Sequence, residues 1–376
     1  MFRKLENVNK VDSLTSKRCR WRQKTVPRWE TAVLGVLLSL GLAACTGPEP
    51  TNVLQGQTMG TYFRVVTRNA ECTVTKSAVQ LRLDDLNASL STYQSDSELS
   101  LLNNHPAGIA IPVGADLAAV LRSADQVARQ SGGAFDVTVG PLVNLWGFGP
   151  ASVNSQTAPT PAAQAAAAAR VGMHLIQFQT DQITKLSDDV YIDLSALAKG
   201  YAVDQIAQLL AANGCVNFMA DIGGEIFVAG LNPQQQPWRL GIETPSPDQL
   251  GDIHTVVSLT DLAIATSGDY RNFRLVDGKR VDHMLDPRTG RPATNFVVSA
   301  TVVHESAMLA DAYATAFMVM GQSQAMALAQ QLDLAVYLIM ARAEQAGDDA
   351  AQRWQIRYNA AMRQYLPAQA TLQESQ

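Results

Sequence analysis

The stretch FMADIGGEIFVA, residues 218–229, contains the pattern from which the fold class follows. Apolar residues lie on both sides of Gly223-Gly224, which predicts a strand broken at a glycine turn. Short apolar runs recur along the chain at spacings typical of hairpins. Further strands are expected at residues 55–67, 190–192, 238–242, 255–259, 263–265, 273–275, 297–303 and 335–339. These spacings favour an α+β fold with mixed, antiparallel-rich sheets and packed helices over a doubly wound parallel sheet of the Rossmann kind.

Helical spacing of apolar residues predicts helices between these strands. They are expected at residues 72–90, 115–131, 195–213, 307–320 and 323–332. The second ends at Gly132-Gly133, which suits a left-handed helix stop. Residues 151–170 are low in complexity, beginning as a Ser/Thr/Pro loop and ending as an Ala-rich helix. We interpret them as an insertion or a seam between lobes and not as a site.

Composition excludes some classes of protein. The chain has 376 residues, of which 47% are hydrophobic and 17% charged, so it contains enough apolar material for a sizeable core. Its formal net charge is -5. Without a basic balance, nucleic acid is a poor candidate partner, and any anionic ligand must be held by local groups.

The N-terminal segment has the composition of an export signal. Residues 1–30 are rich in Lys and Arg, and the apolar run at residues 31–44 is short for a membrane span. The run ends in Leu-Ala-Ala-Cys, which resembles the bacterial lipobox, with Cys45 as the lipidated first residue of the mature chain. A cleaved signal or an uncleaved anchor with an incidental Cys45 is the alternative.

This interpretation divides the chain into segments. We expect a lipoprotein signal peptide at 1–44, a tether at 45–54, a catalytic domain at 55–365 and a polar tail at 366–376. The protein would then be a membrane lipoprotein facing the periplasm. Cys72 and Cys215 remain after cleavage, and a disulfide between them is permitted outside the cytoplasm but is not established by their spacing.

A candidate metal site lies in the segment ADAYATA at residues 310–316. Asp311 and Thr315 are four residues apart on a predicted helix, so a carboxylate and a hydroxyl share one side, flanked by small alanines. Oxygen ligands of this kind suit a hard cation such as Mg²⁺, with Ca²⁺ or Mn²⁺ as alternatives. The competing interpretation is an Asp in the first turn of a helix, where the helix dipole favours it.

Other polar segments are candidates for binding an anion. Asp193 and Lys199 lie where a predicted strand passes into a helix, although an N-capping Asp would look the same. Glycine-containing segments at 132–141, 221–225 and 266–270 could offer backbone donors or could be ordinary turns.

His283 is the candidate base. It begins the segment HMLDPRTG, at the end of a predicted strand and before a Pro-containing turn. An imidazole titrates near neutrality and can take a proton from an attacking hydroxyl, although a lone His is more often structural.

Taken together and in order, these segments resemble the ApbE family of FAD:protein FMN transferases. The segments that carry the resemblance are TMGT at 58–61, STY at 91–93, GAFDVTVGPLVNLWGFGP at 133–150, DLSALAKGYAVD at 193–204, DIGGE at 221–225, ATSGDYRNF at 265–273, HMLDPRTGRP at 283–292 and ADAYAT at 310–315. The resemblance implies an ApbE-like (T-fold-like) architecture.

The resemblance also implies roles for individual residues. It implies FAD contacts at Met59, Tyr93, Ala134, Phe135, Asp136, Asp193, Lys199 and Leu285. It implies a metal ion held by the Ala196 carbonyl, Asp311 and Thr315, with His283 and Asp311 as the catalytic residues. Some relatives have a second carboxylate where this chain has Ala314, which makes the choice of metal less certain.

The implied reaction transfers the FMN half of FAD to a Thr or Ser hydroxyl and releases AMP. The implied acceptors are extracytoplasmic flavoproteins, such as subunits of sodium-pumping or related electron-transport complexes. Two alternatives use the same residues: a metal-dependent FAD pyrophosphatase, and a lipoprotein that binds FAD without chemistry.

Overall fold

The computed structural model describes residues 51–68, 72–149, 157–246, 251–270, 272–342 and 354–368. They belong to one compact unit, Pro48–Gln376. Among them, no helix has the length and apolar character needed to cross a membrane.

An eight-stranded sheet forms the centre of this unit. Its strands, in spatial order, are β1 (Asn52–Thr58), β2 (Thr61–Thr67), β6 (Phe218–Ile222), β7 (Glu225–Ala229), β10 (Leu262–Gly268), β15 (Val297–His304), β16 (Ala335–Ala341) and β17 (Trp354–Tyr358). Every neighbouring pair is antiparallel. The antiparallel-rich α+β prediction is confirmed, and residues 218–229 form the hairpin β6–β7.

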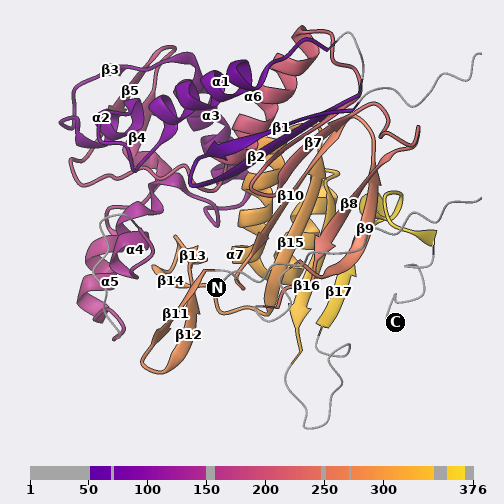
Figure 1. Ribbon diagram of the computed structural model, residues 1–376. Helices are drawn as coiled ribbons and strands as arrows, with labels where there is room; N and C mark the ends of the chain where they lie inside the picture. Colours follow the sequence, from indigo (N-terminus) through magenta and orange to yellow (C-terminus); the bar gives the residue numbers. More distant parts are fainter. Residues whose placement is uncertain are drawn as a thin grey trace, which may run out of the picture. The chain divides into compact units, whose positions relative to one another are not determined.

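Helices cover one face of the sheet, as Figure 1 shows for α7 behind β10 and β15. The four longest helices contribute to this core: α1 (Lys76–Leu90), α3 (Ala115–Gln130), α6 (Ala198–Ala212) and α7 (Ala307–Gln331). The other face packs against the hairpin β8 (Trp238–Glu243)–β9 (Ile253–Leu259) and α8 (Ala360–Arg363). On β10, Ala263 and Ala265 belong to the helical core and Ile264 to the opposite one, so strand alternation assigns each residue to a face.

Shorter elements surround the helices. The three-stranded sheet consists of β3 (Ile111–Pro112), β5 (Gln182–Lys185) and β4 (Ile176–Phe178). The remaining helices are α2 (Glu98–Asn104), α4 (Gly140–Leu145) and α5 (Pro161–Ala168), with 3₁₀ turns at Val137–Val139 and Met173–Leu175. Two small hairpins complete the described fold: β11 (Phe273–Val276) with β12 (Lys279–Asp282), and β13 (Leu285–Asp286) with β14 (Arg291–Pro292).

Two strand predictions were wrong in detail. Residues 55–67 form a hairpin and not one strand, because Met59 and Gly60 adopt positive φ values of 47° and 71° and reverse the chain. Residues 190–192 form no strand, because the Asn103 side chain bonds both the N–H and the carbonyl of Ile192. The first strand begins at Asn52, inside the segment that was expected to be a tether.

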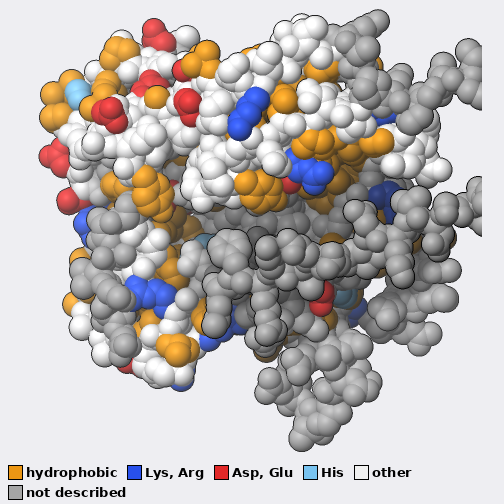
Figure 2. All heavy atoms as spheres, viewed as in Figure 1, with side chains coloured by type: hydrophobic (Ala, Val, Ile, Leu, Met, Phe, Trp, Pro, Cys, Tyr) orange, Lys and Arg blue, Asp and Glu red, His pale blue; other side chains and the backbone are white. Residues whose placement is uncertain are grey.

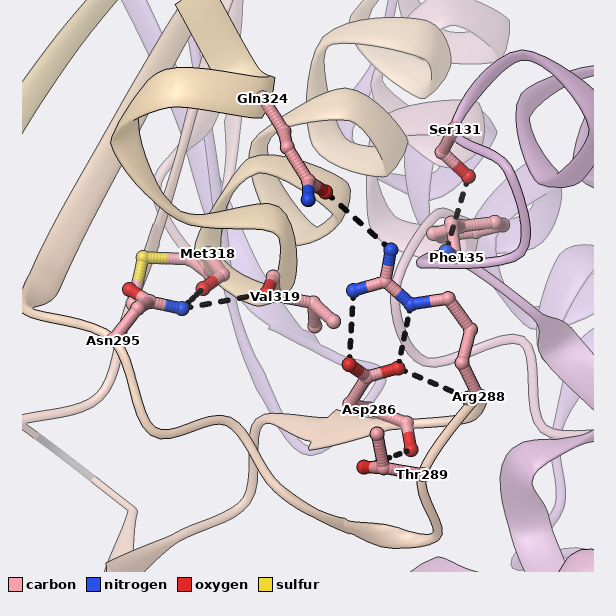
Figure 3. A network of polar contacts seen from close by, with 9 residues as sticks. All are labelled: Ser131, Phe135, Asp286, Arg288, Thr289, Asn295, Met318, Val319 and Gln324. Atoms are coloured by element: carbon pink, nitrogen blue, oxygen red, sulfur yellow. Dashed lines mark hydrogen bonds and ion pairs between the residues drawn. The ribbon is translucent and has the colours of Figure 1, made fainter.

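The predicted break between two C-terminal helices is confirmed. Within α7, Gly321 has φ 73° and ψ 170°, which interrupts the helix between residues 320 and 322. The Asn295 side chain donates to the carbonyls of Met318 and Val319 just before this break (Figure 3). The last turn before Gly321 is therefore held by a side chain from another segment.

Cys72 and Cys215 form a disulfide, with Cα atoms 4.5 Å apart. The bond joins the segment before α1 to the segment after α6, across 143 residues of sequence. Such bonds persist mainly in oxidising compartments.

Acidic side chains gather over the part of the unit that contains α2 and the three-stranded sheet, and basic ones are scattered singly in the same view (Figure 2).

Candidate active site

A cavity of about 580 Å³ brings together segments that are far apart in the sequence. This volume lies within the range of roughly 300–1,000 Å³ that small-molecule sites occupy. The predicted site residues that line it are Tyr93, Ala134, Phe135, Asp136, Asp193, Ala196, Lys199, His283, Leu285, Asp311 and Thr315. Met59 does not line it but lies in the β1–β2 turn, packed against the core. Cys45 lies outside the described residues.

The junction of α6 and α7 sets the centre of the site. Gly200, in the first turn of α6, has no room for a side chain, since a Cβ there would lie 2.3 Å from the Ala307 carbonyl oxygen of α7. Asp204, one turn further along, accepts hydrogen bonds from the Ala307 and Met308 N–H groups and from the Ser306 hydroxyl. The two helices therefore meet with Lys199 and Asp311 side by side.

Lys199 contacts two carboxylates. Its Nζ lies 2.9 Å from Glu225 Oε1 and 3.5 Å from Asp311 Oδ2. Asp311 Oδ2 also accepts the Gly200 N–H at 3.2 Å. The Glu225 side chain is only 6% exposed, and its Oε2 is bonded to no described residue.

These contacts shift the ionisation of all three groups. Burial raises the pKa of Asp311, and it raises the pKa of Glu225 to about 7 against the attraction of Lys199. Burial alone would lower the pKa of Lys199, but the charges of Asp311 and Glu225 outweigh it and raise that pKa. The lysine therefore stays protonated at neutral pH.

Further oxygen donors lie beside this cluster. Thr315, one turn after Asp311, shares a hydrogen bond of 3.0 Å with the Ser267 hydroxyl of β10. Ala196 lies just before α6, and the Gly200 N–H, which would reach its carbonyl in a regular helix, donates to Asp311 instead. Carboxylate, hydroxyl and carbonyl oxygens thus converge on one wall of the cavity.

The charge balance of the cavity favours a cation. Six carboxyl groups line it, from Asp136, Asp193, Asp221, Glu225, Glu243 and Asp311. Lys199 is the one Lys or Arg among the described residues of the lining. A phosphate-containing ligand would be repelled by this wall unless a divalent cation intervened, and the oxygen donors present are the ones that Mg²⁺ prefers. The residues therefore fit a hard cation.

His283 directly follows β12, the second strand of the hairpin β11–β12, and lines the cavity. Its Nδ1 is 3.1 Å from the Asn272 carbonyl oxygen, so the neutral ring carries its proton on Nδ1 and leaves Nε2 as an acceptor. Burial is the main cause of a pKa below the ordinary 6.5. The ring is therefore neutral at pH 7 and able to accept a proton.

Two predicted carboxylates are already engaged by their own loops. Asp136 accepts from the Thr138 N–H and hydroxyl and from the Met173 N–H. Asp193 accepts from the Ser195 N–H and hydroxyl. These bonds fix the turns that form the wall of the cavity.

The turn after His283 is tied to α7. Arg288 forms a bidentate pair with Asp286 and donates to Gln324, as Figure 3 shows. In the same view, the Ser131 hydroxyl accepts the Phe135 N–H and closes the glycine turn that ends α3. Leu285 and Phe135 are therefore held on short, internally bonded segments.

Sequence reasoning missed Glu225, Ser267 and Asp204 as residues of the site. Glu225 and Ser267 were noted only as parts of glycine turns, and Asp204 only as the end of a motif. Asp204 acts on Ser306, 102 residues later, and Glu225 meets a lysine from another element. Local spacing in the sequence does not predict such contacts, although a carboxylate directly after a glycine turn between two apolar runs is a usable signal.

A cavity with oxygen donors that suit a hard cation, beside a charged lysine and a neutral histidine, favours an enzyme that acts on a phosphate-containing small molecule. Comparison with known proteins narrows this class. The profile of the ApbE family matches residues 59–338. The chain belongs to the ApbE family.

Two relatives carry the name FAD:protein FMN transferase. The one from Vibrio cholerae is 40% identical over 316 residues, covering 83% of this chain and 93% of that protein. The one from Haemophilus influenzae is 38% identical over 322 residues, covering 82% and 92%. The solved structure of the flavin transferase ApbE from Vibrio cholerae superposes with a TM-score of 0.76 at 36% identity, over 85% of this chain and all of that one.

Proposed function

We propose that this chain transfers the FMN half of FAD to a Thr or Ser hydroxyl of another protein and releases AMP, in a reaction that requires Mg²⁺. It is an FAD:protein FMN transferase by its relationship to the proteins above. The observation that carries the proposal is the cluster in which Lys199 lies between Glu225 and Asp311 on the cavity wall. Mg²⁺ there would neutralise phosphate charge as the P–O–P bond breaks.

The proposed binding residues cover the length of the cavity. Ala196, Asp311 and Thr315 would hold the cation through oxygen atoms. FAD would contact Tyr93, Ala134, Phe135, Asp136, Asp193, Lys199 and Leu285 in the cavity. A contact with Met59, which lies outside the lining in the β1–β2 turn, rests on the family resemblance alone. Tyr93 is 75% exposed, which leaves its ring free to cover a flat ligand at the cavity mouth.

His283 is the proposed base. The acceptor hydroxyl attacks the FMN phosphorus, its proton passes to Nε2 of His283, and the bond to the AMP phosphate breaks. The Asn272 carbonyl holds the Nδ1 proton, so Nε2 faces the reaction as the basic nitrogen. Water in place of the hydroxyl would give FMN and AMP.

The direct test uses the chain from residue 46 onward with FAD, Mg²⁺ and an acceptor domain that carries a flavinylation-type Thr. We expect the acceptor to gain the mass of FMN less water, and an equal amount of AMP to be released. If Mg²⁺ is chelated before the reaction starts, neither product should form. AMP without labelled acceptor would favour the pyrophosphatase, and stable FAD binding without AMP would favour a flavin carrier.

Replacing His283 with Gln should slow transfer by roughly 10²–10⁴-fold, the usual contribution of a general base, while leaving the KM for FAD nearly unchanged. Because the pKa of His283 is lowered, its neutral form persists below pH 6.5. The wild-type rate should therefore be level through pH 7 and fall only at lower pH, and the variant should lack that fall.

His254→Gln is the matched control, since His254 also has a pKa lowered by burial but lies on β9, away from the cavity. It should keep the wild-type rate and pH profile. An equal loss of FAD affinity and rate in His283→Gln would assign His283 to binding.

The protein is proposed to be a lipoprotein attached to the membrane through Cys45 and facing the periplasm. The Cys72–Cys215 disulfide supports a compartment outside the cytoplasm. Its acceptors would then be extracytoplasmic flavoproteins, such as subunits of sodium-pumping or related electron-transport complexes.

Cys45→Ala should move the protein from the membrane fraction to the soluble fraction with its specific activity retained. Fractionation followed by the transfer assay checks both. Retention in the membrane fraction would show that another segment anchors the chain.

A further inference from the structure

We infer that Glu225 is a further ligand of the divalent-cation site. The family resemblance assigns only Ala196, Asp311 and Thr315 to that site. The inference rests on the proposed function, because it extends the cation site formed by Ala196, Asp311 and Thr315. It starts from an oxygen atom: Glu225 Oε2 is buried and bonded to no described residue.

Strand register places Glu225 on the correct face of the sheet. Ile226 pairs with Ile264 across β7 and β10. Alternation then puts Glu225 on the same face as Ala265 and Ser267, which is the face that α7 covers. Ser267 bonds Thr315 on that face, so strand and helix present their oxygen atoms to each other.

The distances from Lys199 show that the Glu225 and Asp311 carboxylates lie close together. One ammonium lies within 3.5 Å of both Asp311 and Glu225, so a compact cation between the two side chains reaches both. One lysine can neutralise only one of the two carboxylates, so a second charge on this pair needs a further cation as its partner. An uncompensated buried carboxylate is costly, and a divalent cation supplies the missing partner for Oε2.

The test is a titration of the full chain, solubilised in detergent and freed of metal by chelation, with Mn²⁺ as the probe. The electron paramagnetic resonance signal of free Mn²⁺ reports binding without any turnover. Glu225→Gln keeps the size of the side chain and removes its charge. It should raise the Kd for Mn²⁺ by roughly tenfold or more, at least as much as losing an outer-shell partner of a metal costs.

Asp188→Asn is the matched control. Asp188 accepts the Ala107 N–H and does not line the cavity, so this change should leave the Kd for Mn²⁺ within about twofold. If Glu225→Gln does not fold, judged by circular dichroism, Glu225→Asp keeps the charge and withdraws the oxygen by one methylene, and it should also weaken Mn²⁺ binding. Wild-type affinity in the folded Glu225 variant overturns the inference.

A role through Lys199 alone would give a different result. In that case Glu225→Gln would bind Mn²⁺ like the wild type and lose FAD affinity in the presence of chelator. The transfer assay on the wild-type chain is separate from these titrations. A wild type that transfers FMN while the variant keeps its Mn²⁺ affinity would leave the function standing and remove Glu225 from the site.

Discussion

Asp311→Asn should reduce Mg²⁺-dependent transfer of FMN by at least about a hundredfold. A metal ion that neutralises phosphate charge supplies several kcal/mol of transition-state stabilisation, and roughly 1.4 kcal/mol corresponds to a tenfold change in rate. Asparagine keeps the shape of the side chain and can still accept the Gly200 N–H. The loss would therefore report the missing charge and not a rearranged helix.

The measurement is the rate of AMP release and acceptor labelling as a function of Mg²⁺ concentration. Asp188→Asn is the control, since Asp188 accepts the Ala107 N–H and does not line the cavity. The control should follow the wild-type curve. A folded Asp311 variant with the wild-type rate at every Mg²⁺ concentration would remove Asp311 from the cation site.

The fold class could be predicted because its signals are local. Gly223-Gly224 between two apolar runs predicts the hairpin β6–β7 without any knowledge of how the rest of the chain folds. The break at Gly321 was predicted for the same reason, since the helical pattern changes there within a few residues. Where a distant side chain decides the structure, as Asn103 does for Ile192, local propensity gave the wrong element.

The site was predictable residue by residue but not as an arrangement. Spacing on a helix places Asp311 and Thr315 on one side, and that follows from 3.6 residues per turn. That Lys199 lies between Asp311 and Glu225 depends on how closely α6 approaches α7 and on the register of β7 against β10. Both are properties of tertiary packing, which the sequence encodes only through residues such as Gly200.

Gly200→Ala should lower the stability of the protein and also move Lys199 away from Asp311 in the active site. In an ordinary helix, replacing Gly with Ala stabilises by roughly 1 kcal/mol. Here the new Cβ would lie 2.3 Å from the Ala307 carbonyl oxygen and 2.7 Å from the Met308 Cα, which are backbone atoms that cannot rotate away. Overpacking typically costs about 1–3 kcal/mol, so the clash outweighs the gain in helix propensity and the sign of the effect is reversed.

Urea unfolding of the wild type and the variant gives the stability difference, and the transfer assay gives the second consequence. Separation of α6 from α7 moves Lys199 away from Asp311, and a displacement of about 1 Å in a catalytic arrangement can cost about a hundredfold in rate. Gly114→Ala is the control, because its Cβ would meet the Glu98 carboxylate at 3.3 Å and no backbone atom among its three nearest neighbours. It replaces the N-cap residue of α3, so it should cost about 1 kcal/mol at most and leave the transfer rate unchanged. A Gly200→Ala variant that is more stable than the wild type would show that a Cβ fits between α6 and α7. Close packing at Gly200 would then not explain why Lys199 contacts Asp311.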